Sequence, residues 1–543
     1  MAKKKKAAKP FQDQSQSIAI PPSITYIGLL IGLLFLLFHT FFLNFNPPLE
    51  DAYISFRYAK NFIHGNGIVF NAGEYVEGYT NFLWILMLSG FKDYMPQASV
   101  ILGIIFALGT IIVSFRIAQI IFPHPIYNLI PVILLAFNPS YALWSTGGLE
   151  THFFSFLVIC GIYFYLRQHK HIMLSSFFFA IATLARPEGF LFLTVSFIYL
   201  IGLWIVKKVN YKDILVFFIT AAVILIPYLI FKLWYYRELL PNTFYAKVIP
   251  GAAQYATGFD YAINFFSTNF GWTGLVLLLI AGIFCYNKIW FTYLVSLIVV
   301  FSIYIFLVGG DCFPYFRFFV PILSLFCLLI GEGIIHVEKI IKRFFKGWEM
   351  FPPILVASIL GYLLYFNLTA CPTGPQAKEL VPKYNKGDAD NIKTGKWFAK
   401  VFPASTKMAI NPAGVIPYYT SFHTIDMLGL NDKHIARQRV EKVKKGLVGH
   451  MKFDANYVFS KKPDIIIVGA AELLPCPANI QKIQEYYQWI SQVIPGDRAL
   501  LTDKRLFKEY ELVAANITSD SFLPFFLCKG SNIKDKDIVY LSR

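Results

Sequence analysis

Long apolar segments dominate the first 370 residues of this 543-residue chain. A helix needs about 20 consecutive apolar residues to cross the hydrocarbon core of a bilayer. About eleven such segments occur, near residues 25–44, 98–122, 125–144, 149–168, 171–185, 188–206, 213–234, 271–286, 289–308, 317–337 and 352–369. The segments at 171–185 and 271–286 are short, so ten or twelve spans remain possible. The sequence therefore predicts a polytopic α-helical membrane protein.

The composition supports this class and argues against nucleic-acid binding. Hydrophobic residues make up 56% of the chain and charged residues only 15%, a balance that soluble domains do not have. The formal net charge is +17, but the basic residues are not grouped on a soluble face interleaved with aromatic side chains. We therefore expect membrane lipids, and no nucleic acid, among the partners.

The short connections between segments predict the orientation. Inner connections of a membrane protein are rich in Lys and Arg. The basic tail 1–24 carries Lys3 to Lys6 and Lys9, and with eleven spans every inner connection has a basic residue in or beside it. These residues are Arg116; Arg167 and Lys170; Lys207, Lys208 and Lys212; Lys288; and Lys339, Lys342, Arg343 and Lys346. We expect a multi-pass protein of the cytoplasmic membrane, with a cytoplasmic N-terminus and residues 371–543 outside.

Unusual polar strings gather at the outer ends of the segments. They are Glu50-Asp51, 145–150, 186–188, 237–243 and 309–317. A single polar string at the bilayer edge is explained equally well by solvation or by a function. Five such strings on the same side of the membrane favour a functional site on that side. The outer loops are 45–95 and 237–270, and residues 51–63 read as an amphipathic helix lying in the interface plane.

Residues 371–543 have the composition of a soluble domain. A helix at 389–402, a strand near 406–411, a helix at 412–420 and strands near 423–428 and 463–469 alternate along it. Such alternation is typical of an α/β layer. We interpret this domain as a lid or a platform that binds the acceptor.

Seven strings carry a resemblance to a known family. They are Glu50–Arg57, Val76–Asn81, Gly148–Thr151, Arg186–Gly189, Leu240–Lys247, Gly309–Asp311 with the following Arg317-Phe318, and Asp426–Asp432. In this order they resemble bacterial GT-C-type membrane glycosyltransferases, in particular relatives of the terminal arabinofuranosyltransferases of mycobacterial cell-wall assembly. The resemblance covers residues from about 45 to about 440.

The resemblance implies a function and a place for the chemistry. It implies a GT-C catalytic module at 25–370 that transfers a sugar from a polyprenyl-phosphate donor to a glycan or glycolipid acceptor outside the membrane, with inversion. In this class the first outer loop contributes an acidic pair, and its first member is the usual general base. That position is typically Asp, whereas here it is Glu50, which leaves open whether Glu50 or Asp51 takes the proton.

The chemistry of such a donor defines the remaining candidates. Phosphate is the leaving group, so the protein must supply a base, cations and positioning. The candidate phosphate-binding cations are Arg186, Arg237, Arg317 and Lys247, although each can instead anchor a lipid headgroup. The candidate substrate-binding residues are Arg57, Glu77, Tyr79, Asn81, Glu150, Glu188, Asn242, Asp311, Asp426, Asn431 and His434. Arg57 can alternatively orient the acidic pair or face headgroups, and His434 can pair locally. Asp311, Glu150 and Glu188 can pair with the candidate arginines instead of binding sugar, and pairing with Arg186 is favoured for Glu188.

A metal is not required by this chemistry. Glu50, Asp51 and Asp311 offer oxygen ligands for a divalent cation, but no His or Cys set with ligand spacing lies on the outer side. We expect no essential metal or cofactor. Pairing among Cys312, Cys371, Cys476 and Cys528 remains open.

Two other functions compete with sugar transfer. A flippase or transporter of lipid-linked sugars would need ionisable groups within the spans, which are nearly uncharged here. A non-catalytic glycan receptor would leave the acidic pair without a role.

Overall fold

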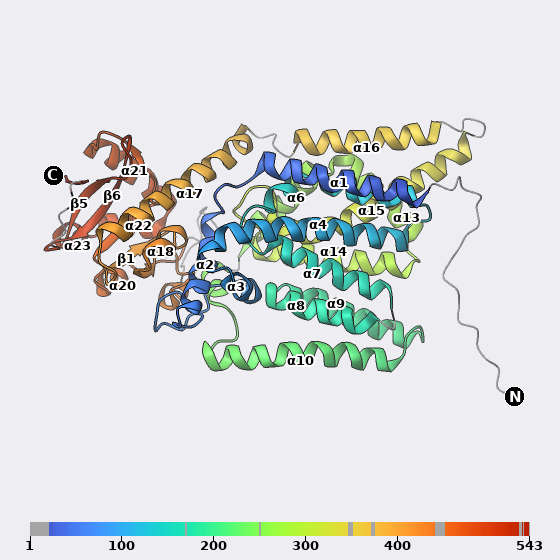
Figure 1. Ribbon diagram of the computed structural model, residues 1–543, viewed down its shortest axis with the longest axis horizontal. Helices are drawn as coiled ribbons and strands as arrows, with labels where there is room; N and C mark the ends of the chain where they lie inside the picture. Colours follow the sequence, from blue (N-terminus) through green and yellow to red (C-terminus); the bar gives the residue numbers. More distant parts are fainter. Residues whose placement is uncertain are drawn as a thin grey trace.

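The computed structural model describes residues 21–168, 171–248, 251–345, 351–370, 375–439, 451–531, 535 and 537–541. Lys3 to Lys6, Lys9, Lys170, Lys346 and Cys371 lie outside these residues. The chain forms a long helical bundle with a strand-containing domain at one end, as Figure 1 shows.

Every predicted apolar segment is helical. The bundle consists of α1 (Pro22–Leu43), α4 (Met95–Ile121), α5 (Leu129–Ala136), α6 (Pro139–Trp144), α7 (Thr151–Leu166), α8 (Ile172–Ala185), α9 (Gly189–Ile205), α10 (Tyr211–Tyr235), α12 (Ala252–Asn269), α13 (Gly271–Cys285), α14 (Ile289–Val308), α15 (Val320–Phe344) and α16 (Phe351–Ala370). Within the described ranges, six helices are long and apolar enough to cross a membrane, or seven if one bent pair counts as a span. The predicted class, a polytopic helical membrane chain with a separate C-terminal domain, is confirmed.

Two segments differ in detail from the prediction. Residues 125–144 form the short helix η2 (Pro125–Asn128) followed by α5 and α6, and Pro139 begins α6 just after the capping residue Asn138. Much of the loop 237–270, which was predicted to lie outside, is helical: it contains α12, which packs against α14 and meets α13 at 94°. A Cβ on Gly258 would lie 2.1 Å from the Phe306 carbonyl oxygen, so α12 and α14 touch backbone to backbone.

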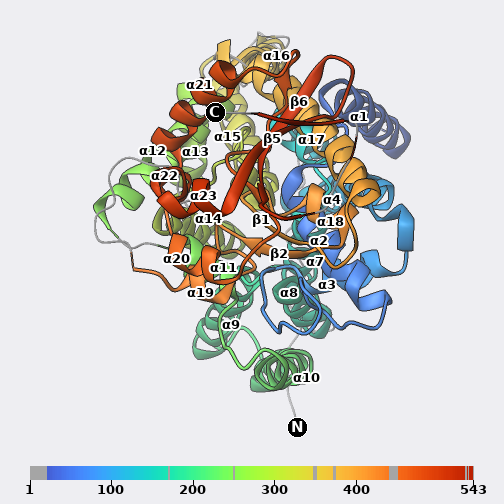
Figure 2. The same cartoon turned by 90° about the vertical axis from the view of Figure 1, so that its left-hand side faces the viewer.

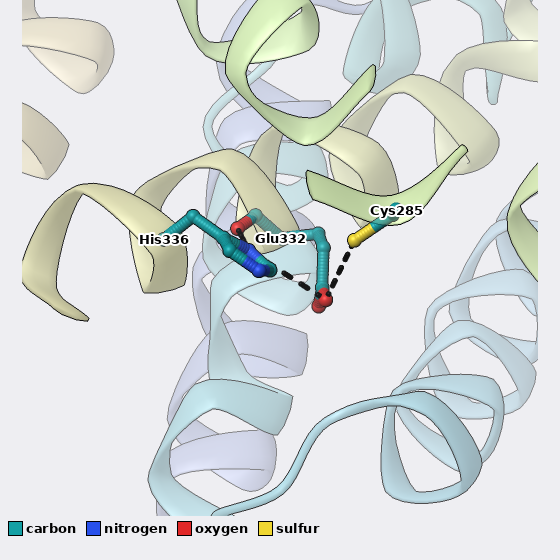
Figure 3. Close-up of side chains that lie close together, drawn as sticks. All are labelled: Cys285, Glu332 and His336. Atoms are coloured by element: carbon teal, nitrogen blue, oxygen red, sulfur yellow. Dashed lines mark hydrogen bonds and ion pairs between the residues drawn. The ribbon is translucent and has the colours of Figure 1, made fainter. Parts of the chain in front are cut away.

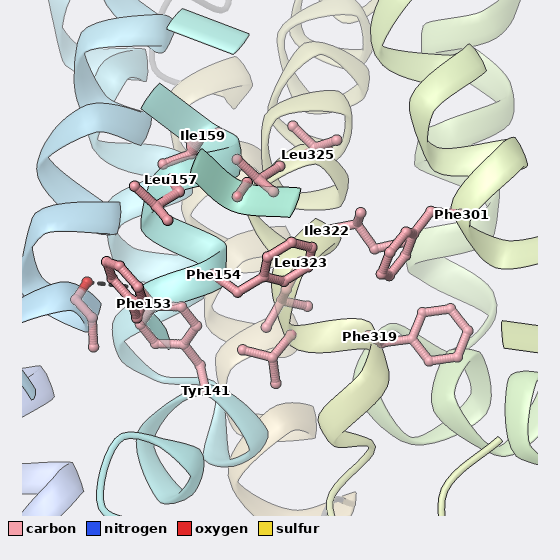
Figure 4. Packing of buried hydrophobic residues seen from close by; sticks show 14 of the residues in the cluster. Tyr141, Phe153, Phe154, Leu157, Ile159, Phe301, Phe319, Ile322, Leu323 and Leu325 are labelled. Carbon is pink, nitrogen blue, oxygen red and sulfur yellow. Dashed lines mark hydrogen bonds between the residues drawn. The ribbon is translucent and has the colours of Figure 1, made fainter. Parts of the chain in front are cut away.

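Helix α15 forms the centre of the bundle. Its residues from Val320 to His336 are all buried. Apolar side chains from α7, α14 and α15 interlock around it, and Figure 4 shows Phe154, Phe301 and Leu323 among them. A Cβ on Gly333 would lie 2.2 Å from the Leu277 carbonyl oxygen, so α13 also packs closely against α15.

The C-terminal domain contains a mixed sheet. Its elements are α17 (Pro375–Val401), β1 (Lys407–Ile410), α18 (Val415–Thr420), β2 (His423–Asp426), α19 (Lys433–Ala436), α20 (Ala455–Ser460), β3 (Ile465–Ile467), β4 (Leu474–Pro475), α21 (Ile480–Val493), α22 (Pro495–Thr502), α23 (Lys504–Glu509), β5 (Tyr510–Asn516), β6 (Ser521–Cys528) and β7 (Ile538–Tyr540). The strand order is β2-β1-β3-β6-β5-β7, with β4 paired to β6. Strands β2, β1 and β3 are parallel and were predicted, whereas the antiparallel half was not.

The first outer loop lies beneath this domain. It contains α2 (Glu50–Ile63) and α3 (Phe82–Ser89). Helix α2 was predicted, but its position in the interface plane was wrong: residues 52–59 are all buried, and α18 packs against the helix. Seen from the domain end in Figure 2, α2 and α18 lie together near the middle of the molecule. The polar face of α2 therefore meets protein over residues 52–59, while Phe62 and Ile63 at its end are exposed.

Candidate active site

Glu50 is the first residue of α2 and binds the C-terminal domain. Its Oε1 accepts hydrogen bonds from the backbone N–H groups of Gly414 (2.7 Å) and Val415 (2.9 Å), and its Oε2 accepts one from Asn391 Nδ2 (3.3 Å). Burial raises the pKa of Glu50 to about 7, against the opposing effect of these hydrogen bonds. The carboxyl group is thus held by protein donors on both oxygens.

Asp51 differs from its neighbour. In the part of the chain that the structure describes, its half-buried carboxylate has no hydrogen-bond or ion-pair partner. It lies within electrostatic range of Arg317, Cys312 and Asp388. Of the acidic pair, Asp51 has the carboxylate that is open to a ligand.

Asp388 is a third carboxyl group at this place, and the sequence analysis missed it. It lies on α17, is 5% exposed and accepts a hydrogen bond from the backbone N–H of Glu50. Its Oδ2 is buried without a partner among the described residues. Burial, followed by the charges of Glu50 and Asp51, raises its pKa to about 8. Helical spacing with the buried Asn391 and Phe398 was the available signal for a polar group on an inward face.

A chain of polar contacts links α2 to α14. Asn81 Nδ2 donates to Ser55 Oγ (2.9 Å) and to Glu150 Oε2 (2.7 Å). Arg186 Nη1 donates to Glu150 Oε1 (2.6 Å), and its Nη2 to Glu188 Oε1 (3.0 Å). The Tyr304 hydroxyl on α14 donates to Glu188 at 2.7 Å. The predicted pairing of Glu188 with Arg186 is therefore present, and Nε, Nη1 and Nη2 of Arg186 all donate to carboxylates.

Arg317 lies beside this chain. It donates to both oxygens of Asp311, at 2.7 and 3.2 Å, and its guanidinium packs against the Trp144 and Phe313 rings. The Phe318 ring centroid is 5.3 Å from the Arg317 guanidinium carbon and 5.5 Å from that of Arg186. Both arginines are thus buried side by side, away from lipid. In the described chain Arg317 Nη1 has no partner, so it can donate to a ligand.

The two other candidate cations are exposed. Arg237 follows α10 and has no ion pair within the described ranges. Lys247 ends α11 (Asn242–Lys247), and its charge acts on Cys312, the residue after Asp311. Lys247 is therefore the exposed cation that the structure places near Arg317 and Asp51.

Arg57 holds the loop to the C-terminal domain, and its predicted role in binding substrate does not fit this geometry. It is 4% exposed and makes five hydrogen bonds. Their acceptors are the carbonyl oxygens of Phe70, Pro417 and Phe422, Asn71 Oδ1 and Thr424 Oγ1. A guanidinium has five N–H groups, so none remains for the acidic pair, a headgroup or a substrate.

Several other candidates also have protein partners. Glu77 pairs with Lys232 at 2.8 Å, and the Tyr79 hydroxyl contacts that of Tyr236 at 2.9 Å. Asn242 Nδ2 donates to the carbonyl oxygens of Gly429, Leu430 and Asp432.

Three candidates from the C-terminal domain make local contacts. Asp426 is 1% exposed and accepts from the backbone N–H and the side-chain amide of Asn431. His434 is exposed and pairs with Asp454 at 2.8 Å, the local alternative considered for it. Asn431 Oδ1 also accepts a hydrogen bond from the Tyr58 hydroxyl on α2 at 3.2 Å. These side chains thus shape the domain and its contact with the first loop. The six described cysteines are all free thiols, including Cys312, Cys476 and Cys528.

Comparison with known proteins gives a consistent picture of the fold. A family model described as a domain of unknown function (DUF8728) matches residues 381–520. A curated relative, the terminal beta-(1->2)-arabinofuranosyltransferase of Corynebacterium glutamicum, is 24% identical over 358 residues, which are 55% of this chain and 49% of that protein. The chain thus spans about half the length of the curated relative that it matches.

Solved structures resemble a larger part of the chain. ArnT from Cupriavidus metallidurans bound to undecaprenyl phosphate superposes with a TM-score of 0.51 at 10% identity, over 75% of this chain and 86% of that one. The Archaeoglobus fulgidus oligosaccharyltransferase in its apo form superposes with a TM-score of 0.54 at 10% identity, over 95% and 76%. With the helical bundle, the acidic first loop and the strand-containing tail described above, these likenesses show that the chain has the GT-C membrane glycosyltransferase fold.

Proposed function

We propose that this protein transfers a sugar from a polyprenyl-phosphate donor to a hydroxyl group of a glycan or glycolipid at the outer face of the cytoplasmic membrane. The observation that carries the proposal is the free carboxylate of Asp51 within electrostatic range of the buried cation Arg317, with Lys247 and Asp51 both acting on Cys312. The matched ArnT structure is bound to undecaprenyl phosphate, and a matched Archaeoglobus fulgidus AglB structure contains a dolichol-phosphate. Both support a lipid phosphate as the donor here.

Asp51 is the general base in this proposal. Glu50 is less suited because both of its oxygens already accept hydrogen bonds from the C-terminal domain. Asp388 is less suited as well, because burial raises its pKa to about 8 and its carboxyl group would be protonated at neutral pH. The acceptor hydroxyl would give its proton to Asp51 as its oxygen attacks the anomeric carbon.

Arg317 and Lys247 receive the leaving phosphate. As the anomeric C–O bond breaks, both electrons stay with the phosphate oxygen, and the growing negative charge needs donors in a poorly hydrated site. Arg317 Nη1 is available, while the bidentate pair with Asp311 fixes the orientation of the guanidinium. Attack on the face opposite the phosphate inverts the anomeric centre. The proposal needs no metal or organic cofactor.

The proposal includes the orientation of the chain in the membrane, which we infer from the Lys and Arg residues in the short connections between helices. It places α2, Arg317 and the C-terminal domain on the outer side and the N-terminus in the cytoplasm. A reporter enzyme that works only outside the cytoplasm should be active when it is fused after Arg543. Activity of a reporter that works only in the cytoplasm, fused at the same place, would contradict the topology.

Amide substitutions test the base. The full chain in proteoliposomes is given a polyprenyl-phosphate-linked radiolabelled sugar and a native envelope extract as acceptor. Asp51→Asn should lose transfer by about a hundredfold or more, the scale of a lost general base. Glu50→Gln should lose less than about tenfold, because the amide oxygen can still accept from Gly414 and Val415.

Asp93→Asn is the matched control, since Asp93 is an exposed acid of the same outer loop. It should behave as wild type. Near-normal transfer by Asp51→Asn would refute the assignment of the base. Movement of labelled donor across the bilayer without any transfer would favour the flippase.

A further inference from the structure

A second cluster of reactive side chains lies in the half of the bundle away from the C-terminal domain. Cys285 is the last residue of α13, and Glu332 and His336 lie one turn apart on α15. All three are buried, and one ligand atom of each lies within 4.8 Å of the others. Figure 3 shows the three side chains pointing toward one another. None of these residues takes part in the proposed sugar transfer.

Glu332 is the centre of the cluster. Its Oε1 is 3.2 Å from Cys285 Sγ and 3.7 Å from His336 Nδ1. Lys288, in the connection after α13, also donates to Oε1 at 2.9 Å. The other oxygen, Oε2, is buried without a hydrogen-bond partner among the described residues, and Glu332 is only 2% exposed. A buried carboxylate oxygen without a donor is costly, so the Glu332 carboxylate can take a further cation. Oε1 is the oxygen that faces Cys285 and His336, and it is therefore the one nearest to a shared metal.

We propose that Cys285, Glu332 and His336 bind a zinc ion. Thiolate, imidazole and carboxylate are the three ligand types that zinc takes, and three protein ligands leave a fourth position for water. In a tetrahedral site the ligand atoms are about 3.4–3.6 Å apart, so the widest spacing here must close by about 1 Å. The side chains lie at a helix end and on one face of α15, where small rotamer shifts can supply this movement.

The surroundings of His336 favour metal binding. The Glu332 backbone carbonyl accepts a hydrogen bond from His336 Nδ1 at 2.9 Å, and the ring stacks on Phe284 at 4.9 Å. Metal-binding histidines commonly donate one ring N–H to a backbone carbonyl and bind the metal through the other nitrogen. Here Nδ1 makes the bond to the carbonyl and is also the nitrogen 3.7 Å from Oε1, so Nε2 is the zinc ligand and a turn of the ring must bring it toward the metal.

Lys288 competes with the metal for Glu332. Its ammonium group and a zinc ion cannot both occupy the space beside Oε1, but its side chain is 39% exposed and can turn outward. The Lys288 ammonium group therefore competes with zinc for Glu332, and a variant without this ammonium group should bind zinc more tightly. A cluster that served only as an ion pair would gain no metal affinity from this change.

Metal titration of the full-length protein in detergent tests the proposal. Wild type should bind one equivalent of Zn²⁺, and Co²⁺ in its place should give a thiolate-to-cobalt charge-transfer band. Cys285→Ser and Glu332→Gln should weaken binding by at least about a hundredfold and remove the band. Cys327→Ser is the matched control, because Cys327 is a buried thiol on α15 outside the cluster, and it should bind as wild type.

Lys288→Gln supplies a result that misfolding cannot imitate. It should tighten Zn²⁺ binding by about fivefold, the value of a half-exposed ion pair. Absence of the cobalt band in wild type, or equal binding by wild type and Cys285→Ser, would overturn the site. So would unchanged affinity in Lys288→Gln.

Discussion

Replacing Arg57 by Lys should loosen the contact between the first outer loop and the C-terminal domain. Lys keeps the positive charge but has only three N–H groups, so at least two of the five hydrogen bonds of Arg57 are lost. Four of the acceptors keep a second donor, from Asn61, Ser421 or Thr424, so the cost is that of the lost bonds to a charged group. At about 1–3 kcal/mol for each bond, two bonds give about 2–6 kcal/mol in total. Three of the five acceptors belong to Pro417, Phe422 and Thr424, so most of this cost falls on the domain contact.

Hydrogen exchange of the full chain in detergent measures the effect. Amides of α2 and α18 should lose protection by about thirtyfold or more, which corresponds to about 2 kcal/mol. Arg505→Lys is a matched control in the same domain, because Arg505 forms an exposed pair with Asp503. It should leave the protection of α2 and α18 as in wild type. Equal protection in Arg57→Lys and Arg505→Lys would refute the argument that Arg57 joins the two parts.

Three further predictions follow from the site. Gly414→Ala should reduce transfer by about tenfold or more, because its Cβ would lie 2.0 Å from the Glu50 carbonyl oxygen. Its helix content, measured by circular dichroism, should stay as in wild type. Gly387→Ala is the control: a Cβ on Gly387 would have no atom within 4 Å, so this variant should behave as wild type. Burial raises the pKa of Glu50 from 4.5 to about 7 and that of Asp388 from 3.8 to about 8, so the stability that they contribute is present at low pH and lost as the pH rises through these values. The Tm of the full chain should therefore fall between about pH 5 and pH 8, and Asp388→Asn should flatten this dependence. Arg317→Lys should retain part of the transfer that Arg317→Gln loses, since it keeps the charge without the bidentate geometry; equal activity of the two variants would contradict a role at the phosphate.

The apolar pattern was sufficient to predict the bundle and one half of the site. Each polar string follows or precedes an apolar helix, and helices of similar length end at the same level of the bundle. Glu150 and Arg186 therefore meet in space although no sequence period relates them. Arg317 and Asp311 meet for a different reason, because only six residues of one turn separate them.

The other half of the site depends on contacts between distant parts of the chain. Glu50 meets Gly414, Val415 and Asn391 across more than 340 residues, and nothing in the local pattern of either segment indicates the pairing. The amphipathic character of α2 gave its helical state correctly. It did not reveal that a protein domain would cover the polar face. Hydrophobic periodicity shows which face of a helix is apolar, but it does not show whether water, lipid headgroups or protein contacts the polar face.

The contact between Glu50 and the Gly414 loop has a consequence for experiments on chimeric proteins. The tail supplies three hydrogen-bond donors to the residue next to the proposed base, so loss of activity after deletion of the tail would not show that the tail recognises the acceptor. A tail exchanged between two relatives must bring a loop that fits the first turn of the host's α2. Specificity can be transplanted between such proteins only as a matched pair of loop and tail.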